Sequence, residues 1–264
     1  MPIKDLKVDL EGKEQDADIR AKKEVLSRIL QGNWNTLLKG QGMEFAGFRT
    51  YTFEDDASLI DWKATLRSDE ILVREFEEHK TINVIVMVDV SDTMLFTSQD
   101  KLKAEYAAEL GFALSDAILK AGDAVGMAMF TDHLVENIPP NIGKGSHILI
   151  RRALENPMNY GGKSNLKNVM KLLNATVAER SLIIIISDFI GLEKGWQTYL
   201  DIIAQRMDVL GIMLRDPRDK DFTMLGGQFE LQDPNSGHVL LVDTTKYAPL
   251  FRDEVNQEEK IIER

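Results

Sequence analysis

TINVIVMVDVSDT, residues 81–93, is a strand-like run that ends in polar side chains. Its first part, Thr81–Val90, is almost entirely apolar or β-branched, and only Asn83 and Asp89 interrupt it. A continuous run of this kind is typical of a strand covered on both faces, as in a parallel sheet flanked by helices. The stretch therefore predicts a buried strand whose carboxyl end carries Asp89 and the hydroxyl residues that follow it.

The residues after this strand alternate between helix-like and strand-like patterns. Apolar residues recur at helical spacing from Leu102 and stop near Gly122, where a glycine ends the pattern. Further strand-like and helical patterns follow in turn, and this alternation favours a doubly wound, mostly parallel α/β sheet of the Rossmann type. The predicted strands are Ala124–Phe130, a returning strand at His133–Ile138 before the Pro139-Pro140 break, Leu182–Ser187 and Val209–Leu214; the predicted helices are Ser146–Leu154, Leu166–Ala178 and Trp196–Arg206.

Two flanking regions differ in character from this alternating part. In the N-terminal region, 1–80, Ile19–Leu38 has an amphipathic helical pattern, and Phe48–Glu78 is rich in charged residues, aromatics and β-formers. In the C-terminal region, 217–264, a turn sequence at 233–237 predicts a hairpin, and Tyr247–Glu263 predicts a charged helix. We therefore expect a central α/β domain at 81–216 and a small satellite in which the N- and C-terminal flanks pack together.

The composition excludes several classes of protein. The chain has 264 residues with 32 Lys and Arg against 43 Asp and Glu, which gives a net charge of −11. A phosphate-backbone binder would need clustered basic residues, so no nucleic-acid partner is expected. Because the chain has no cysteine, disulfides, thiolate nucleophiles and Cys-ligated zinc are all excluded. No apolar run reaches the roughly 20 residues that span a bilayer, and the N-terminus has no signal-peptide core, so we expect a cytoplasmic protein without membrane insertion.

Oxygen-bearing side chains follow two of the predicted strands and one glycine-rich turn. Asp89, Ser91 and Thr93 present one carboxylate and two hydroxyls at alternate positions, and Asp188 directly follows the most apolar predicted strand. A parallel sheet brings the ends of its strands to one edge, where ligands bind at the switch point in strand order. Ser164 follows the glycine-rich turn and supplies either a helix cap or a further oxygen. Hard oxygens suit Mg²⁺ or Mn²⁺, so the set predicts a metal site.

This pattern resembles the von Willebrand factor A fold and its metal-ion-dependent adhesion site. The adhesion-site pattern is Asp-x-Ser-x-Ser after the first strand, a Thr in a middle loop and an Asp after the fourth strand. Asp89, Ser91 and Asp188 match it, while Thr93 replaces the second Ser and Ser164 replaces the loop Thr. Both replacements keep a hydroxyl. The resemblance implies a bound Mg²⁺ whose coordination is completed by a carboxylate of a protein partner.

Further short segments, most of them before the first predicted strand, form a distinctive run. They are Gly42–Phe45, Arg49–Tyr51, Asp55-Asp56, Ile60–Ala64, Arg67, Val73–Glu78, Gly122-Asp123, Pro139-Pro140, Ser187–Phe189 and Asp216-Pro217. Over roughly residues 42–244 this run resembles the bacterial and archaeal domain-of-unknown-function family fifty-eight. The resemblance implies a neighbouring MoxR-type AAA+ ATPase and a role in the assembly or maturation of other proteins. Two positions depart from the family pattern, because Glu54 replaces a Gly and Ser58 replaces an Arg.

Three carboxylates in the upstream segment allow two interpretations. Asp55, Asp56 and Asp61 lie close together in the sequence, where they could bind a second cation or perform acid–base chemistry. In the structural interpretation they pair with basic residues and fix this segment on the sheet domain, with Trp62 as an apolar anchor. The candidate basic partners are Arg49, Arg67 and Arg74. We favour the structural interpretation.

Two functions are compatible with these motifs. The first is a metal-dependent protein–protein interaction module without catalytic residues. The alternative is an Mg²⁺-dependent hydrolase, such as a phosphatase that uses Asp89 as its nucleophile. Ser91 stands where a haloacid-dehalogenase phosphatase needs a second Asp, and Pro157 stands where a phosphate-binding loop needs its first Gly. The sequence therefore favours the interaction module.

Overall fold

The computed structural model describes residues 6–8, 10, 44–53, 55–68, 70–77, 82–176, 181–221, 226–232 and 237–262. These residues divide into two compact units. The larger contains residues 6–8, residue 10 and the described residues from Asn83 onward, and the smaller contains those from Glu44 to Ile82. The helix predicted at Ile19–Leu38 lies outside the described residues. The last residues of the helix predicted at Leu166–Ala178 also lie outside them.

A five-stranded sheet forms the centre of the larger unit. Its strand order is β5-β4-β3-β6-β7; β5 is antiparallel to β4, and all other neighbours are parallel. Every residue of β4 and β6 is buried, as the apolar runs predicted. The mixed α/β class and the mostly parallel sheet predicted from the sequence are therefore confirmed. The strands are β3 (Asn83–Asp89), β4 (Ala124–Phe130), β5 (Leu134–Asn141), β6 (Ser181–Ser187) and β7 (Asp208–Met213).

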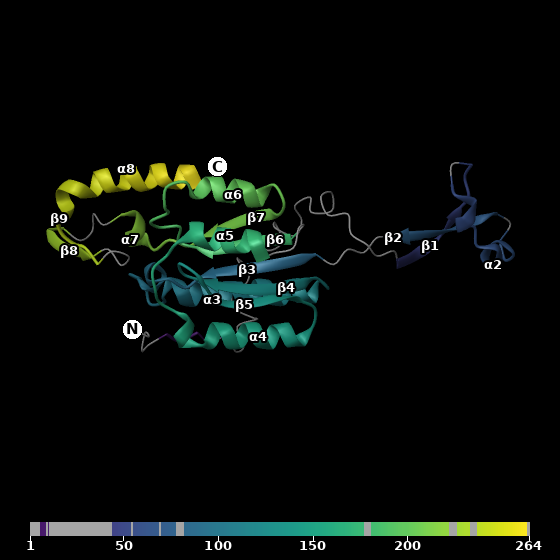
Figure 1. Ribbon diagram of the computed structural model, residues 1–264, viewed down its shortest axis with the longest axis horizontal. Helices are drawn as coiled ribbons and strands as arrows, with labels where there is room; N and C mark the ends of the chain where they lie inside the picture. Colours follow the sequence, from purple (N-terminus) through teal and green to yellow (C-terminus); the bar gives the residue numbers. More distant parts are fainter. Residues whose placement is uncertain are drawn as a thin grey trace. The chain divides into compact units, whose positions relative to one another are not determined.

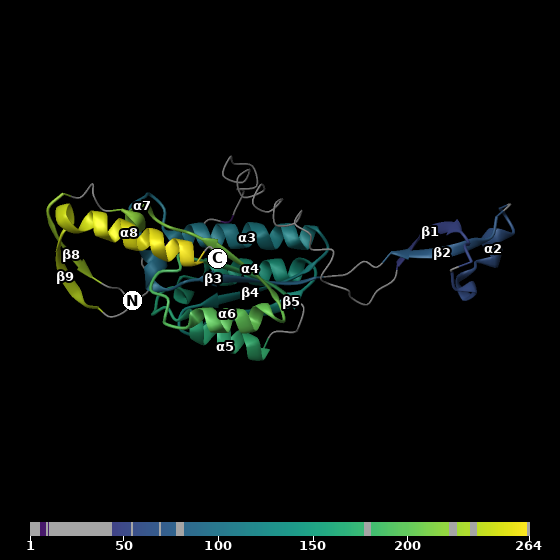
Figure 2. The same ribbon diagram turned by 90° about the horizontal axis from the view of Figure 1, so that it is seen from above.

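Helices cover both faces of this sheet (Figure 1). Figure 2 shows the sheet from its edge, with α3 and α4 on one face and α5 and α6 on the other. The helices are α3 (Lys103–Lys120), α4 (Lys144–Glu155), α5 (Leu166–Thr176) and α6 (Trp196–Ala204). Each begins and ends within a few residues of the helix predicted from apolar spacing. The two layers bury both faces of the parallel strands, which explains their continuous apolar sequences.

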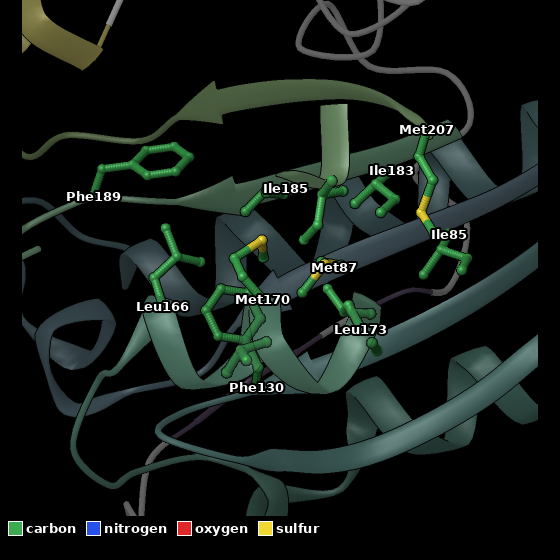
Figure 3. Packing of buried hydrophobic residues seen from close by; sticks show 13 residues of the cluster. Ile85, Met87, Phe130, Leu166, Met170, Leu173, Ile183, Ile185, Phe189 and Met207 are labelled. Carbon is green, nitrogen blue, oxygen red and sulfur yellow. The ribbon is translucent and has the colours of Figure 1, made fainter. Parts of the chain in front are cut away.

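Alternation along the strands divides the core between the two helical layers. Ile85 and Met87 of β3 join Ile183 and Ile185 of β6 in the cluster beneath α5 and α6 (Figure 3). The intervening Val86 and Val88 face α3. There Gly111 allows close packing, because a Cβ at this position would lie 3.0 Å from Val88 Cγ2 and 3.6 Å from Val86 Cγ1.

Strand β5 differs from its prediction. The sequence predicts a strand that ends before Pro139-Pro140, whereas β5 continues through both prolines to Asn141. Proline has no N–H group to donate to a neighbouring strand, and an edge strand tolerates this loss. The pairing with β4 shifts register between Val125 and Met127, so the prolines lie at an irregularity of the ladder.

The C-terminal elements belong to the same unit as the sheet. Lys220 at the end of α7 forms an ion pair with Glu259 of α8 at 2.7 Å, and Ile262 packs against the core cluster beneath α5 and α6. The elements are α7 (Pro217–Lys220), the antiparallel hairpin of β8 (Gln228–Gln232) and β9 (Val239–Asp243), and α8 (Thr244–Ile262). The predicted packing of the two flanks against each other remains a prediction.

The smaller unit is built on an antiparallel pair of strands, β1 (Glu44–Thr50) and β2 (Leu72–Glu77). The connection between them contains η3 (Ala57–Leu59) and α2 (Trp62–Thr65). Ile60 forms an isolated bridge with Val73, and both side chains are buried. Trp62, by contrast, is 64% exposed within the described structure. Its predicted role as an anchor on the sheet domain stays a prediction.

Gly126 provides a sharp test of the packing between β4 and β5. A Cβ at this position would lie 2.5 Å from the carbonyl oxygen of Ile138 and 2.7 Å from the nitrogen of Pro140. Because both are backbone atoms, Gly126→Ala forces the edge strand to move and should lower the free energy of unfolding by about 1–3 kcal/mol. The matched control is Gly145→Ala, since a Cβ there meets nothing within 4 Å. Equal denaturant midpoints for the two variants would contradict this strand packing.

Candidate metal centre at the carboxyl ends of β3 and β6

The strand order places a topological switch point between β3 and β6. The strand that follows β3 in the chain, β4, pairs with one edge of β3, whereas β6 pairs with the opposite edge of β3. Ligand sites of open α/β sheets lie beyond the carboxyl ends of strands at such a point. Asp89 is the last residue of β3, Asp188 directly follows β6, and both side chains are 1% exposed. Two of the predicted site residues thus lie at the switch point.

Asp89 accepts hydrogen bonds on both carboxylate oxygens. The backbone N–H of Ser91 donates to Oδ1 at 3.0 Å, and the Ser187 hydroxyl donates to Oδ2 at 2.6 Å. Burial and the nearby negative charge of Asp188 raise the pKa of Asp89 to about 6, although hydrogen bonds from Ser187 and Ser91 oppose the rise. The anionic form of Asp89 is therefore destabilised in the protein alone, and a nearby cation would stabilise it.

Two buried hydroxyls lie beside this carboxylate. Ser91 and Thr93 are 0% and 5% exposed, and their side-chain oxygens are 3.1 Å apart. The short η4 helix (Asp92–Leu95) begins after Ser91 and fixes the spacing of the two hydroxyls. Adjacent oxygen ligands of an octahedral Mg²⁺, each about 2.0–2.1 Å from the ion, are separated by roughly 2.9 Å. The chemistry and spacing of these oxygens fit a hard divalent cation.

The glycine-rich loop before α5 pairs with the segment after β3. Gly161 N–H donates to the Val90 carbonyl at 2.8 Å, and Asp92 N–H donates to the Gly162 carbonyl at 2.8 Å. The Asp92 carboxylate in turn accepts the Gly162 N–H at 2.9 Å. Both glycines have positive φ values, 100° and 123°, a backbone conformation in which any residue with a side chain would be strained. Ser164 follows these glycines in the same loop and is half-buried.

Asp188 is held by a lysine that the sequence did not single out. Lys103 is the first residue of α3, and its Nζ donates to Asp188 Oδ2 at 2.8 Å and to Asp219 Oδ2 at 2.7 Å. The Ile190 N–H donates to the other oxygen of Asp188 at 3.0 Å. A lysine at a helix N-terminus opposes the helix dipole, and that conflict was the available sequence signal.

Asp216 ties the segment after η4 to α7. Its carboxylate accepts the Ser98 N–H at 2.7 Å, the Ser98 hydroxyl at 2.6 Å and the Thr97 hydroxyl at 3.2 Å. Burial raises its pKa, but the hydrogen bonds from Ser98, Arg218 and Thr97 together outweigh that effect, and the net pKa of Asp216 is lowered. Figures 1 and 2 place α7 beyond the carboxyl end of β3. Asp219 of α7 and Asp188 of the candidate site contact the same Lys103 ammonium. The family resemblance included Asp216-Pro217, but no role at the site was predicted for this pair.

Asp55, Asp56 and Asp61 of the smaller unit each have a separate local partner. Asp55 accepts two hydrogen bonds from the Arg49 guanidinium, at 2.5 and 2.7 Å, which hold the pKa of Asp55 well below its usual range. Asp56 caps η3, and Asp61 caps α2. Asp61 also lies 3.5 Å from Arg74 Nε.

These contacts favour structural roles for the three aspartates. Arg67 is exposed, and no carboxylate in the described ranges forms an ion pair with it. Across the described part of the chain, no cluster of three or more carboxylate or imidazole groups is arranged to hold a metal. The candidate centre is therefore the mixed set of hydroxyls and carboxylates at the sheet, rather than the acidic loop of the smaller unit.

Fold and site together define a mixed α/β protein with an oxygen-rich site at the switch point of its sheet. The chain belongs to the family described as "Protein of unknown function DUF58", which matches residues 47–261. It is 27% identical to the uncharacterized protein Rv1480 of Mycobacterium tuberculosis over 234 residues, or 88% of this chain and 72% of that protein. The uncharacterized protein Mb1516 of Mycobacterium bovis shows the same identity and coverage.

The solved structures that match this chain include two from Bacteroides species. The conserved hypothetical protein BatB of Bacteroides thetaiotaomicron is 19% identical, with a TM-score of 0.46 over 67% of this chain and 87% of that chain. An aerotolerance-related membrane protein of Bacteroides fragilis is 18% identical, with a TM-score of 0.44 over 66% of this chain and 88% of that one.

The cytoplasmic location expected from the sequence needs correction. It is contradicted by the similarity to a protein described as a membrane protein, and we do not retain it. None of the helices in the described ranges has the length and apolar character needed to cross a bilayer.

The raised pKa of Asp89 predicts a specific pH dependence of stability without added metal. A carboxyl with a pKa of 3.8 in the unfolded chain and about 6 in the folded protein binds its proton more tightly when folded. The free energy of unfolding should therefore fall by about 2 kcal/mol as the pH rises from 4 to 7. Asp89→Asn removes this contribution, so the variant should be more stable than wild type at pH 7. Parallel stability curves for the two proteins, measured by urea unfolding, would contradict the assignment.

Proposed function

We propose that this chain is a metal-dependent protein–protein interaction module with a von Willebrand factor A-like adhesion site. Asp89, Ser91, Thr93, Ser164 and Asp188 would hold Mg²⁺ or Mn²⁺ directly or through water. The observation that carries the proposal is the pair of buried hydroxyls, 3.1 Å apart, beside a buried carboxylate at the switch point of the sheet. Buried hydroxyls and carboxylates of this kind are the ligands that hard divalent cations prefer.

The local charge supports a cation at this position. Asp188 and Asp219 both contact the ammonium of Lys103, and Asp188 is also close enough to Asp89 to raise the pKa of that carboxyl. Burial makes each uncompensated negative charge costly. When bound, the divalent ion supplies positive charge that compensates these carboxylates and attracts a further anionic oxygen. The protein's own residues position the oxygens: the Ser187 hydroxyl orients Asp89, and the glycine-rich loop positions Ser164.

The proposed protein ligands do not fill all coordination positions of the metal ion, so a partner protein can supply a further ligand. Two hydroxyls from one loop and a half-buried serine from another leave coordination positions that water or a partner's carboxylate can fill. The net charge of −11 repels an acidic partner at long range, so attraction has to come from the metal centre itself. We propose a protein that offers Asp or Glu, with a MoxR-type AAA+ ATPase as the candidate that the family resemblance implies. The module would serve the assembly or maturation of other proteins.

Metal binding should stabilise the fold through the proposed ligands. A ligand that binds only the folded state adds about 2.7 kcal/mol at a hundredfold excess over Kd. Mg²⁺ or Mn²⁺ should therefore raise the Tm of wild type, whereas Asp89→Ala should abolish the shift. Asp132→Ala is the matched control, because Asp132 lies just after β4 but pairs with the exposed His133. Equal shifts for wild type and Asp89→Ala in differential scanning fluorimetry would refute the assigned site.

Partner binding should depend on the same centre. Chelation with EDTA should release a protein captured by the tagged full chain, and Asp89→Ala and Asp188→Ala should fail to capture it. Asp132→Ala should retain the partner. Capture that is indifferent to EDTA and to both site variants would place the interaction on another surface. We further propose that the chain alone has no hydrolytic turnover; Mg²⁺-dependent hydrolysis of a generic phosphate ester that Asp89→Ala abolishes would favour the phosphatase alternative instead.

A further inference from the structure

Lys103 is buried at the edge of the candidate metal centre. Its side chain is 6% exposed, and the two carboxylates that it contacts, Asp188 and Asp219, are 1% and 8% exposed. A buried ammonium is costly unless it is paired and hydrogen-bonded. Its place in the first turn of α3 adds a second cost, because the helix dipole there favours negative charge. The two carboxylates therefore hold Lys103 in an otherwise unfavourable position.

The contact with Asp188 brings Lys103 into competition with the proposed metal ion. Asp188 Oδ2 accepts the Lys103 ammonium at 2.8 Å, and Oδ1 accepts the Ile190 N–H at 3.0 Å. Both oxygens of this carboxylate are thus engaged by donors of the protein itself. A divalent ion bound near Asp188 would interact with the same negative charge as the Lys103 ammonium. The ion must therefore either share this carboxylate with the ammonium or displace the ammonium from it.

We infer that Lys103 is a tethered cation that competes with the divalent ion for Asp188 and so lowers the affinity of the metal centre. This inference rests on the proposed function, because it assigns a tuning residue to the same site. Asp219 is a second carboxylate partner for the Lys103 ammonium, and this makes displacement of the ammonium from Asp188 feasible. Its Oδ2 lies 2.7 Å from Lys103 Nζ, so the ammonium keeps a buried partner when it releases Asp188. Lys103 would then also keep the centre charge-compensated when no metal is bound.

Two substitutions should shift metal affinity in opposite directions. Lys103→Met removes the competing charge and should tighten Mn²⁺ binding by about tenfold to a hundredfold, the range expected for loss of a charged hydrogen bond. Asp219→Asn keeps an acceptor for the Asp216 N–H but removes the second anionic partner of the Lys103 ammonium. Lys103 should then hold Asp188 more firmly, and Mn²⁺ binding should weaken.

The test is a double-mutant cycle on the full chain, with Mn²⁺ affinity measured by isothermal titration calorimetry. If Asp219 acts through Lys103, Asp219→Asn should change affinity much less in the Lys103→Met background than in wild type. Lys101→Met is the matched control, because Lys101 pairs with Glu109 rather than with the site, and this variant should bind Mn²⁺ like wild type. Binding by Lys103→Met where wild type shows none would also support the inference.

The outcomes separate this inference from the proposed function. If wild type binds Mn²⁺, Asp89→Ala abolishes binding and Lys103→Met leaves affinity unchanged or weaker, the metal centre stands and the role of Lys103 is overturned. If neither wild type nor Lys103→Met binds Mn²⁺, the metal centre itself is overturned, and the inference falls with it. Should Lys103→Met fail to fold, Asp219→Asn decides alone: affinity equal to or tighter than that of wild type overturns the competition.

Discussion

Two carboxylates buried at the ends of neighbouring strands impose a charge that the surrounding structure has to compensate. The sheet brings Asp89 and Asp188 together because β3 and β6 pair in parallel, with Val88 opposite Ile186. Around Asp89 the compensation comes from hydroxyl and backbone donors. Around Asp188 it comes mainly from the ammonium of Lys103. In the first turn of α3, Lys103 contacts Asp188 directly. The loop before α5 and the segment leading into α7 instead hold the residues that follow β3, through Asp92 and Ser98.

The sequence predicted those parts of the fold and site that depend on local pattern. The buried strands follow from their apolar runs, and the position of Asp89 follows from the polar end of the first run. The hydroxyls of Ser91 and Thr93 are within four residues of Asp89, so a single turn brings them into one place. The approximate position of Asp188 also followed, because parallel strands share an edge.

The contacts that the sequence did not reveal join residues far apart in the chain. Lys103 lies 85 residues from Asp188 and 116 from Asp219, and no local pattern links such positions. The same holds for Asp216, which anchors Ser98 across 118 residues. In the smaller unit, by contrast, Asp55 finds Arg49 only six residues away, and the pairing expected from the sequence is formed.

The two prolines of β5 have a consequence for self-association. An exposed edge strand offers free N–H and carbonyl groups on which another chain can add a strand, and this is a common route to aggregation. Pro139 and Pro140 lack N–H groups, and the register shift beside them distorts the edge further. The antiparallel edge of the sheet is therefore a poor template for strand addition. This protects an otherwise very apolar sheet from growing into fibrils on that side.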